Sequence, residues 1–366
     1  MTLIVTVILV ALVFEYINGF HDTANSIATV VSTKVLTPRQ AVILAACMNL
    51  LGALWGTAVA RTISSGLVDA RLVAMTSNII ICALLGPIVW NLATWWFGLP
   101  SSSSHALIGG LCGAALAGSD NNWNVIIWSH PNPEHWYQGK GLLWKVIVPM
   151  VTSPMAGLVL GFILMALLYL ALHNLHPSPV NRFFGKAQVF SASAMGLMHG
   201  TNDAQKTMGI IALALLGATT AGHFDHLPGW LSFLRTPAPL PGKELEIAVW
   251  IKVVCALTMA TGTAAGGWRI IRTLGHKMVK LHPINGFAAE TSSATVIFLA
   301  THFGIPVSTT HNISAAIMGV GSARRFNAIK WTVVERMVWA WILTIPVSGL
   351  IAYWLVRMLR LLGWAP

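Results

Sequence analysis

GFHDTANS, residues 19–26, is a polar block inside an otherwise apolar segment, and GTNDAQKT, residues 200–207, is a second copy of it. A hydroxyl-rich turn is duplicated in the same order, as PSSSSH at 100–105 and PVSTTH at 306–311. Two copies of one membrane unit, each with an acidic segment and a hydroxyl-rich turn, are typical of secondary transporters with inverted repeats. In such proteins the binding site lies where the two repeats meet.

The composition indicates an integral membrane protein. Of 366 residues, 55% are hydrophobic and 9% are charged, whereas about 25% of the residues in an average soluble domain are charged. We therefore expect an all-α polytopic fold of about ten to twelve membrane segments, including broken helices and re-entrant hairpins. The first apolar run contains Glu15 and lacks a basic leader, so we expect a retained helix and not a signal peptide. Apolar runs of about 20 residues or more, long enough to span, occur near 3–20, 41–60, 73–98, 142–172, 246–266, 285–304 and 331–356.

The net charge of +11 does not indicate a nucleic-acid partner, because the basic residues gather in short loops between apolar runs. Three loops hold many of them: 182–186, 269–280 and 324–330. The positive-inside rule places these loops in the cytoplasm. The loops expected on the other side contain few Lys or Arg: 61–71, 119–141 and 219–245. Arg357 and Arg360 near the C-terminus do not fit this topology.

We predict two inverted repeats, joined by a linking span and followed by a last span. The segments are 1–118 (first repeat), 119–185 (loop, linking span and linker), 186–320 (second repeat, with a loop insertion at 219–245) and 321–366 (C-terminal span). Each repeat should begin with a helix that breaks at Gly19 or Gly200, where the following Asp can cap a new helix. Pro100 and Pro306 should stop the helices that precede the hydroxyl-rich turns.

Asp22 and Asp203 occupy the same position in the two polar blocks. An ionised carboxylate at the bilayer centre costs about 2.5–3.5 kcal/mol on insertion scales, so each Asp needs a reason to be there. Either each Asp caps its own half-helix, or both contribute to one central ligand or ion site. Recurrence in both repeats favours the shared site.

The hydroxyl-rich turns place hydroxyls and free backbone N–H groups at two helix N-termini. These donors and the positive end of the helix dipole favour an anion. A single turn of this kind is more often a helix cap, but a matched pair favours a tetrahedral oxyanion held from both repeats. The candidate hydroxyls are Ser103, Ser104, Ser308, Thr309 and Thr310.

Lys206 and three further residues could assist this site. Lys206 either forms a local ion pair with Asp203 or supplies positive charge to an anionic substrate and tunes the acidity of Asp203. His105 and His311 close the turns and could carry protons, although a hydrogen bond that orders the turn is the favoured role. Glu290 is a functional candidate because an unpaired glutamate is costly within a membrane.

The four motifs, in this order, resemble those of the PiT family of inorganic phosphate transporters, and the resemblance covers nearly the whole chain. GTNDAQKTMG at 200–209 is closely similar to the bacterial low-affinity members. The resemblance implies symport of inorganic phosphate across the bacterial cytoplasmic (inner) membrane, without a cofactor or enzymatic activity. It places Asp22, Asn25 and Asp203 in the substrate and ion site, with the turn hydroxyls around phosphate. His21 and Asn202, in the same blocks, are candidates for coupling or orientation.

The resemblance also bears on the coupling ion. Sodium-coupled relatives carry an additional acidic residue in the second helix of each repeat, and the aligned positions here are Asn49 and Cys255. This departure favours protons over sodium. Bacterial relatives of this type are similar to carriers of neutral metal–phosphate complexes, so a divalent ion is a candidate co-substrate, with no metal ligands identified. Membrane lipid is the expected surrounding, and the sequence leaves a homo-oligomer open.

Three alternatives remain. The anion could be sulfate, which has the same shape but no proton to donate to Asp22 or Asp203. The protein could be an intramembrane hydrolase that uses Ser104 or Thr310, but adjacent Ser and His residues on one helix seldom face each other and no nucleophile-elbow motif is present. A purely structural membrane protein would leave the buried charges unexplained.

Overall fold

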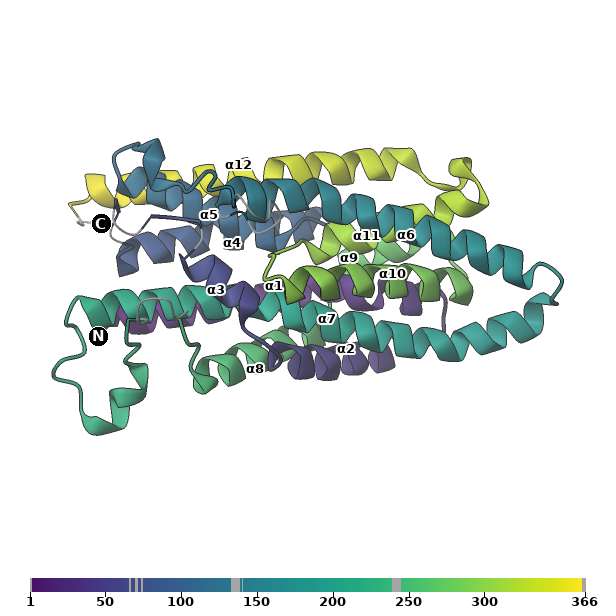
Figure 1. Ribbon diagram of the computed structural model, residues 1–366, viewed down its shortest axis with the longest axis horizontal. Helices are drawn as coiled ribbons and strands as arrows, with labels where there is room; N and C mark the ends of the chain where they lie inside the picture. The colour runs from purple at the N-terminus through teal and green to yellow at the C-terminus, as the bar shows by residue number, and fades with distance from the viewer. Residues whose placement is uncertain are drawn as a thin grey trace.

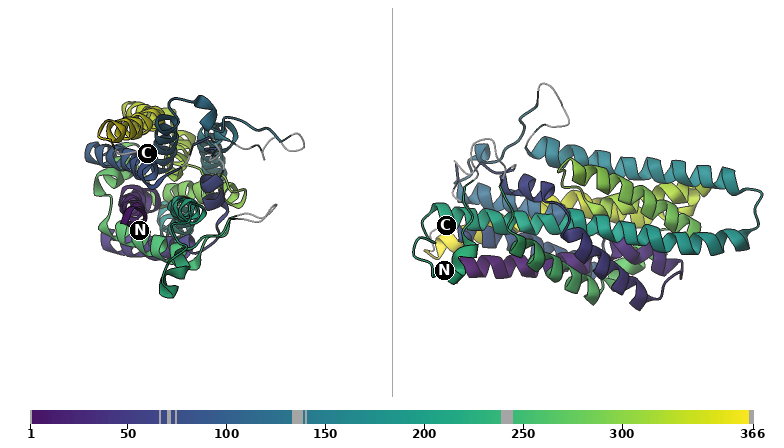
Figure 2. Two further views of the ribbon diagram at one scale, coloured as in Figure 1. Left: turned by 90° about the vertical axis from the view of Figure 1, so that its left-hand side faces the viewer. Right: turned by 60° about the horizontal axis from the view of Figure 1, so that its bottom comes forward.

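The computed structural model describes residues 2–65, 67–69, 72–73, 75–132, 139, 141–238 and 245–363. Over these ranges the chain forms twelve α-helices and no β-strand, with one isolated bridge between Val68 and Ile126. The helices lie side by side in an elongated bundle (Figure 1, Figure 2). The predicted all-α fold is confirmed. Parts of the loops 61–71, 119–141 and 219–245 lie outside the described residues.

The helices follow the same order in both halves of the chain. In the first half they are α1 (Thr2–Ser32), α2 (Pro38–Ala53), α3 (Ala58–Ser65), α4 (Ser77–Phe97) and α5 (Ser103–Gly118). In the second half they are α7 (Pro177–Thr220), α8 (Val249–Ala265), α9 (Trp268–Arg272), α10 (Pro283–His302) and α11 (Thr309–Arg324). The remaining two are α6 (Val148–Leu172) and α12 (Trp331–Leu361). Each half thus has a long helix, two shorter ones and a helical hairpin.

The two halves make equivalent packing contacts, and the long first helix of each half packs on the second helix of the other half. α1 packs on α8 and α7 packs on α2, while α4 packs on α1 and α10 on α7. α5 packs against α12, and α11 packs against α6. α1 and α7 run in opposite directions (Figure 1). This exchange brings the two polar blocks, which α1 and α7 carry, to the middle of the bundle.

The bundle has two different ends. One end, named here the terminal end, holds both chain termini and the connections α3–α4, α5–α6 and α7–α8 (Figure 1, left). The other, named here the basic end, holds the connections α1–α2, α6–α7, α9–α10 and α11–α12 (Figure 1, right). A pocket of about 320 Å³ at the basic end brings Lys280 together with Arg324 and Arg325. Two of the segments predicted to be cytoplasmic, 269–280 and 324–330, therefore meet at one end, whereas 182–186, predicted to be a loop, lies within α7.

The C-terminal arginines that did not fit the predicted topology have local partners at the terminal end. Arg357 lies 3.4 Å from the Asp120 carboxylate, and Arg360 pairs with the same carboxylate. Arg360 also donates to the Gly118 carbonyl, at 2.6 Å. One carboxylate thus offsets one of the two positive charges.

Among the described residues, four helical segments are long and apolar enough to cross a membrane: α1, α4, α6 with its leading turn (Leu143–Leu172), and α12. The α8 helix and the segment Trp268–Lys277 form a fifth span if they are counted together, with a bend of 57° between them. The chain is therefore a multi-pass membrane protein. The count of ten to twelve segments stays a prediction.

The helix breaks predicted at Gly19 and Gly200 are wrong, because α1 and α7 continue through both polar blocks. These glycines serve close helix crossings instead. A Cβ at Gly19 would lie 2.4 Å from the Met259 carbonyl oxygen of α8, and one at Gly200 would lie 2.3 Å from the Asn49 carbonyl oxygen of α2. The chain breaks elsewhere, after α2 and after α8, where Gly56 and Gly266 take positive φ angles of 90° and 74°.

Small residues also allow close contact between α5 and α12 and between α11 and α6. A Cβ at Gly113 of α5 would lie 2.0 Å from the Gly349 carbonyl oxygen of α12, and one at Gly319 of α11 would lie 2.0 Å from the Leu158 carbonyl oxygen of α6. Such close approach is common between membrane helices, whose association depends on van der Waals packing. The hairpins α4–α5 and α10–α11 end their first helices at Phe97 and His302, before the two prolines, as predicted.

Candidate functional site

The two polar blocks meet the two hydroxyl-rich turns in the centre of the bundle. Asp22 and Asn25 come from α1, and Asp203 and Lys206 come from α7; all four are 2% exposed or less. The predicted hydroxyls at the N-termini of α5 and α11 are 3% exposed or less. The structure therefore places the predicted residues in one closed, polar region of an otherwise apolar bundle.

The α11 hydroxyls connect the two acidic blocks. Thr309 donates to Asp203 Oδ2 at 2.9 Å, and Thr310 donates to Asp22 Oδ1 at 3.4 Å. The Asn25 amide donates to both hydroxyls, at 3.1 Å for Thr309 and 2.9 Å for Thr310. Neither Asp caps a new half-helix, since both lie inside continuous helices. Their side chains instead face one common centre.

Lys206 forms the predicted local ion pair and also contacts both hydroxyl-rich turns. Its ammonium pairs with Asp203 and donates to the Ser104 hydroxyl of α5. It also donates to the Val307 carbonyl, at 3.1 Å, in the turn before α11. One buried cation thus links α7 to both hydroxyl-rich turns. An anion bound at these turns would lie close to its positive charge.

One serine in each hydroxyl-rich turn caps the helix that follows. Ser102 and Ser308 are the N-caps of α5 and α11, because their hydroxyls accept the backbone N–H groups of His105 (3.2 Å) and His311 (3.1 Å). Ser308, predicted to contact an anion, therefore has a capping bond as well. Ser103 Oγ is buried and has no hydrogen-bond partner among the described residues.

The two histidines of the turns lie against each other. The ring centroids of His105 and His311 are 4.8 Å apart in an edge-on arrangement, and His311 stacks on Trp341 at 4.2 Å. Their backbone N–H groups, and not their rings, donate the capping bonds described above. The contact joins the N-terminal ends of α5 and α11 at the centre.

His21 and Asn202 hold their blocks against the hairpins. His21 Nδ1 lies 2.8 Å from Asp22 Oδ1, and His21 Nε2 lies 3.1 Å from the Thr94 hydroxyl of α4. In the other half, Asn202 donates to the Thr301 hydroxyl of α10 at 2.8 Å. Both contacts suit an orienting role.

His199 is a candidate site residue that the sequence analysis did not identify. Its Nε2 lies 3.0 Å from Asp203 Oδ2, and its Nδ1 lies 3.0 Å from Asn49 Oδ1. Asn49 is held in turn by a hydrogen bond to Thr263, at 2.9 Å. The sequence contains a pattern that could have identified it: His199 precedes Asp203 by one helical turn, so the two side chains share one helix face.

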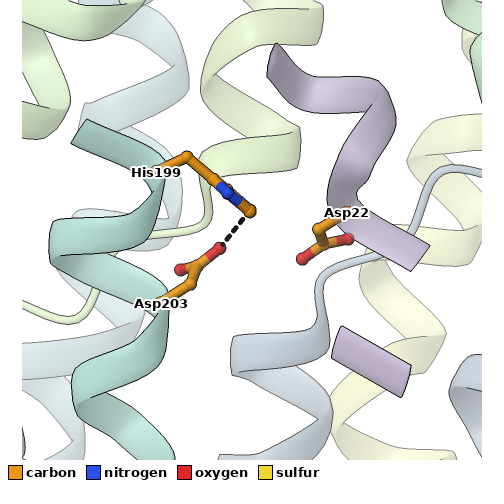
Figure 3. A group of neighbouring side chains, drawn as sticks. All are labelled: Asp22, His199 and Asp203. Carbon is orange, nitrogen blue, oxygen red and sulfur yellow. Dashed lines mark ion pairs between the residues drawn. The ribbon is translucent and has the colours of Figure 1, made fainter. Parts of the chain in front are cut away.

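Asp22, His199 and Asp203 form a group that could hold a metal ion (Figure 3). One ligand atom from each lies within 4.8 Å of the others. Carboxylate oxygen and imidazole nitrogen are donors that divalent ions accept. The group lies beside the hydroxyls of α11, so a cation there would adjoin an anion bound to them.

Glu290 lies outside this central network. Its carboxylate accepts hydrogen bonds from Thr29 of α1 and from Ser191 and Gln188 of α7, the last at 3.2 Å. It is fully buried. It cannot contact an anion at the turn hydroxyls directly in this arrangement.

The chain is similar to known phosphate transporters along its whole length. It matches the profile of the phosphate transporter family over residues 18–352. A probable low-affinity inorganic phosphate transporter of Bacillus subtilis is 42% identical over 98% of this chain and 98% of its own length. One of Rhizobium meliloti is 44% identical over 96% of this chain and 94% of its own length. A solved structure described as the sodium-dependent phosphate transporter has a TM-score of 0.79 at 22% identity and covers 99% of this chain and 100% of that one, which shows the fold.

Proposed function

Because this chain belongs to the phosphate transporter family, we propose that it imports inorganic phosphate by proton symport, with alternating access to the site between α1, α7 and the hydroxyl-rich turns. The relatives are named as transporters, so the protein is a transporter and not an enzyme. Phosphate is the substrate that the family implies. The coupling ion and the transport cycle are the parts proposed here.

The charge balance of the site is the observation that carries the proposal. Two carboxylates, Asp22 and Asp203, share the centre with one ammonium, Lys206. A phosphate anion brought to this centre would add negative charge to a site where low dielectric makes repulsion strong. The anion therefore needs a cation to enter with it. Symport follows from this requirement.

A proton and a divalent metal both suit that requirement. A proton can bind a carboxylate or phosphate itself, and Asn49 supplies a neutral amide at a position where the resemblance expects an acid in sodium-coupled carriers. A divalent ion would bind Asp22, His199 and Asp203, which offer three ligand atoms in one group. We propose that the proton is the coupling ion and that metal–phosphate is a form of the substrate.

The exchanged packing of the two halves supports alternating access. α1 and α7 are antiparallel (Figure 1), and each packs on the second helix of the other half. Inverted repeats with a site at their interface produce this arrangement. The site then opens toward either side by related movements of the two hairpins, α4–α5 and α10–α11, against α1 and α7.

Uptake of labelled phosphate into proteoliposomes tests the proposal. An inward proton gradient should drive accumulation, a protonophore should abolish it, and replacing sodium with choline should leave it unchanged. Excess sulfate should compete poorly, because it offers no proton to the carboxylates. Accumulation driven by a sodium gradient at fixed pH would overturn proton coupling, and equal competition by sulfate would overturn the choice of anion.

Two variants test the shared site. Asp22→Asn and Asp203→Asn keep the size of each side chain and remove its charge, and uptake should collapse in both. Asp120→Asn is the matched control, since this exposed carboxylate lies at the terminal end, and its uptake should be near normal. Near-normal transport by either central variant would contradict a site built from both halves.

A further inference from the structure

Two buried glutamates flank the central site on opposite sides along α1. Glu15 and Asp22 are seven residues apart on this helix, and Thr29, the partner of Glu290, follows after another seven. Seven residues are two turns, about 10 Å along the axis, so all three side chains share one face. Glu15 therefore lies toward the terminal end and Glu290 toward the basic end.

Glu15 is fully buried between helices of both halves. Its Oε2 accepts a hydrogen bond from Thr207, one turn beyond Asp203 on α7, and its Oε1 has no partner within the described part of the chain. The titratable groups that face it are Asp203 and Lys206 on α7 and Cys255 on α8. Lys206 is already engaged by Asp203, so it does not pair with Glu15.

Glu290 is also fully buried but has a different set of partners. Its two oxygens accept three hydrogen bonds, from Thr29, Ser191 and Gln188. The side chains that face it from α1 and α7 are these three neutral groups. Across the residues that the structure describes, neither glutamate forms an ion pair with Lys, Arg or His.

A packing role does not explain these two carboxylates. Neither lies at a helix start, where an acid could cap or face the positive end of a dipole. A buried carboxylate without a cation is costly in a membrane, and binding a proton removes most of that cost. Because the turn hydroxyls are elsewhere, neither glutamate contacts the anion, and a proton is the ligand that both can take.

We propose that Glu15 and Glu290 carry the symported proton between the central site and the two ends of the bundle, Glu15 on the terminal side and Glu290 on the basic side. The inference rests on the proton coupling proposed above. At each glutamate an O–H bond forms when the proton arrives from water and breaks when the proton leaves for another water molecule. Thr207 links Glu15 to the helix that carries Asp203, which places it one turn from the site.

The test separates proton-driven uptake from phosphate exchange. Glu15→Gln and Glu290→Gln imitate the protonated side chain, so exchange of labelled phosphate between equal pools, which needs no net proton movement, should stay within about twofold of the unmodified protein. Uptake driven by a proton gradient should fall at least tenfold, by the usual relation of rate to barrier. Glu335→Gln, an exposed glutamate of α12, is the matched control and should change neither rate.

Each outcome decides the inference. Gradient-driven uptake that survives in both glutamine variants would overturn it, as would loss of exchange together with uptake in a variant whose melting temperature is unchanged. If a glutamine variant does not fold, Glu15→Asp and Glu290→Asp keep an ionisable group, and an unaltered pH profile of uptake in them would count against the proposal. If the unmodified protein ignores a proton gradient and follows sodium, the proposed coupling fails first, and this inference fails with it.

Discussion

Replacing Lys206 tests whether the central site depends on one buried cation. The change Lys206→Met keeps an unbranched side chain of similar length and removes the charge. Asp203 would then lose its ammonium partner while it stays fully buried. The remaining contacts of Asp203, with Thr309 and His199, do not replace a fixed positive charge.

The size of the effect follows from the burial of both partners. Breaking a buried ion pair by removing one member costs about 3–5 kcal/mol, because an uncompensated charge stays behind. Asp203→Asn should cost a similar amount, since it leaves the buried Lys206 ammonium with neutral partners and no counter-charge. The double variant has no stranded charge, so its loss should be well below the sum, with a coupling energy of about 2 kcal/mol or more.

A double-mutant cycle of unfolding free energies, measured by denaturation in detergent micelles, gives this coupling. Phosphate uptake should be lost in all three variants, so stability and not transport distinguishes them. Additive losses, within about 0.5 kcal/mol, would refute the view that Lys206 and Asp203 neutralise each other in the folded protein.

Five further substitutions address the turns, the helix crossings and the surface. Thr310→Ala should weaken apparent phosphate affinity about three- to tenfold in uptake assays. Ser308→Ala should instead lower stability by about 1 kcal/mol, because the N-cap of α11 is lost. The reverse pattern would contradict a binding role for Thr310 and a capping role for Ser308. Gly200→Ala should destabilise by about 1–3 kcal/mol through overpacking against α2. Gly185→Ala, in an open stretch of the same helix where the nearest atom is 3.8 Å from the added Cβ, should instead gain up to about 1 kcal/mol; equal effects on the melting temperature would count against the crossing. Arg360→Gln should change the unfolding free energy by less than about 1 kcal/mol, because its partner Asp120 is 77% exposed. A larger loss would show that this ion pair is more than a surface contact.

The sequence predicted that the two carboxylates and the turn hydroxyls would lie together, because these residues are duplicated. Asp22 and Asp203 recur in two polar blocks, and the hydroxyls recur before two helices. Duplication of a costly group favours a shared role, and the structure places both carboxylates beside Thr309 and Thr310. The assignment of phosphate came from the resemblance, since hydroxyls, an ammonium and N-termini suit any tetrahedral oxyanion.

The sequence could not predict whether a glycine breaks a helix or admits a neighbouring one. Gly200 faces the Asn49 carbonyl of α2, and nothing local to residue 200 reports that contact. Glu15 and Thr207 likewise meet across a long separation in the chain. Residues whose role depends on such cross-chain contacts become visible only once the helices are packed.

The glycine crossings have a consequence for how the bundle can move. Gly19 joins α1 to α8 and Gly200 joins α7 to α2, so each tight seam ties one half of the chain to the other. The two halves of the chain are therefore not expected to move as rigid bodies against each other, because such a movement would break both close helix contacts. We expect α1, α2, α7 and α8 to act as one stiff frame. The hairpin α4–α5 with α12, and the hairpin α10–α11 with α6, then form two arms, and each arm carries one hydroxyl-rich tip toward or away from the frame's acidic centre.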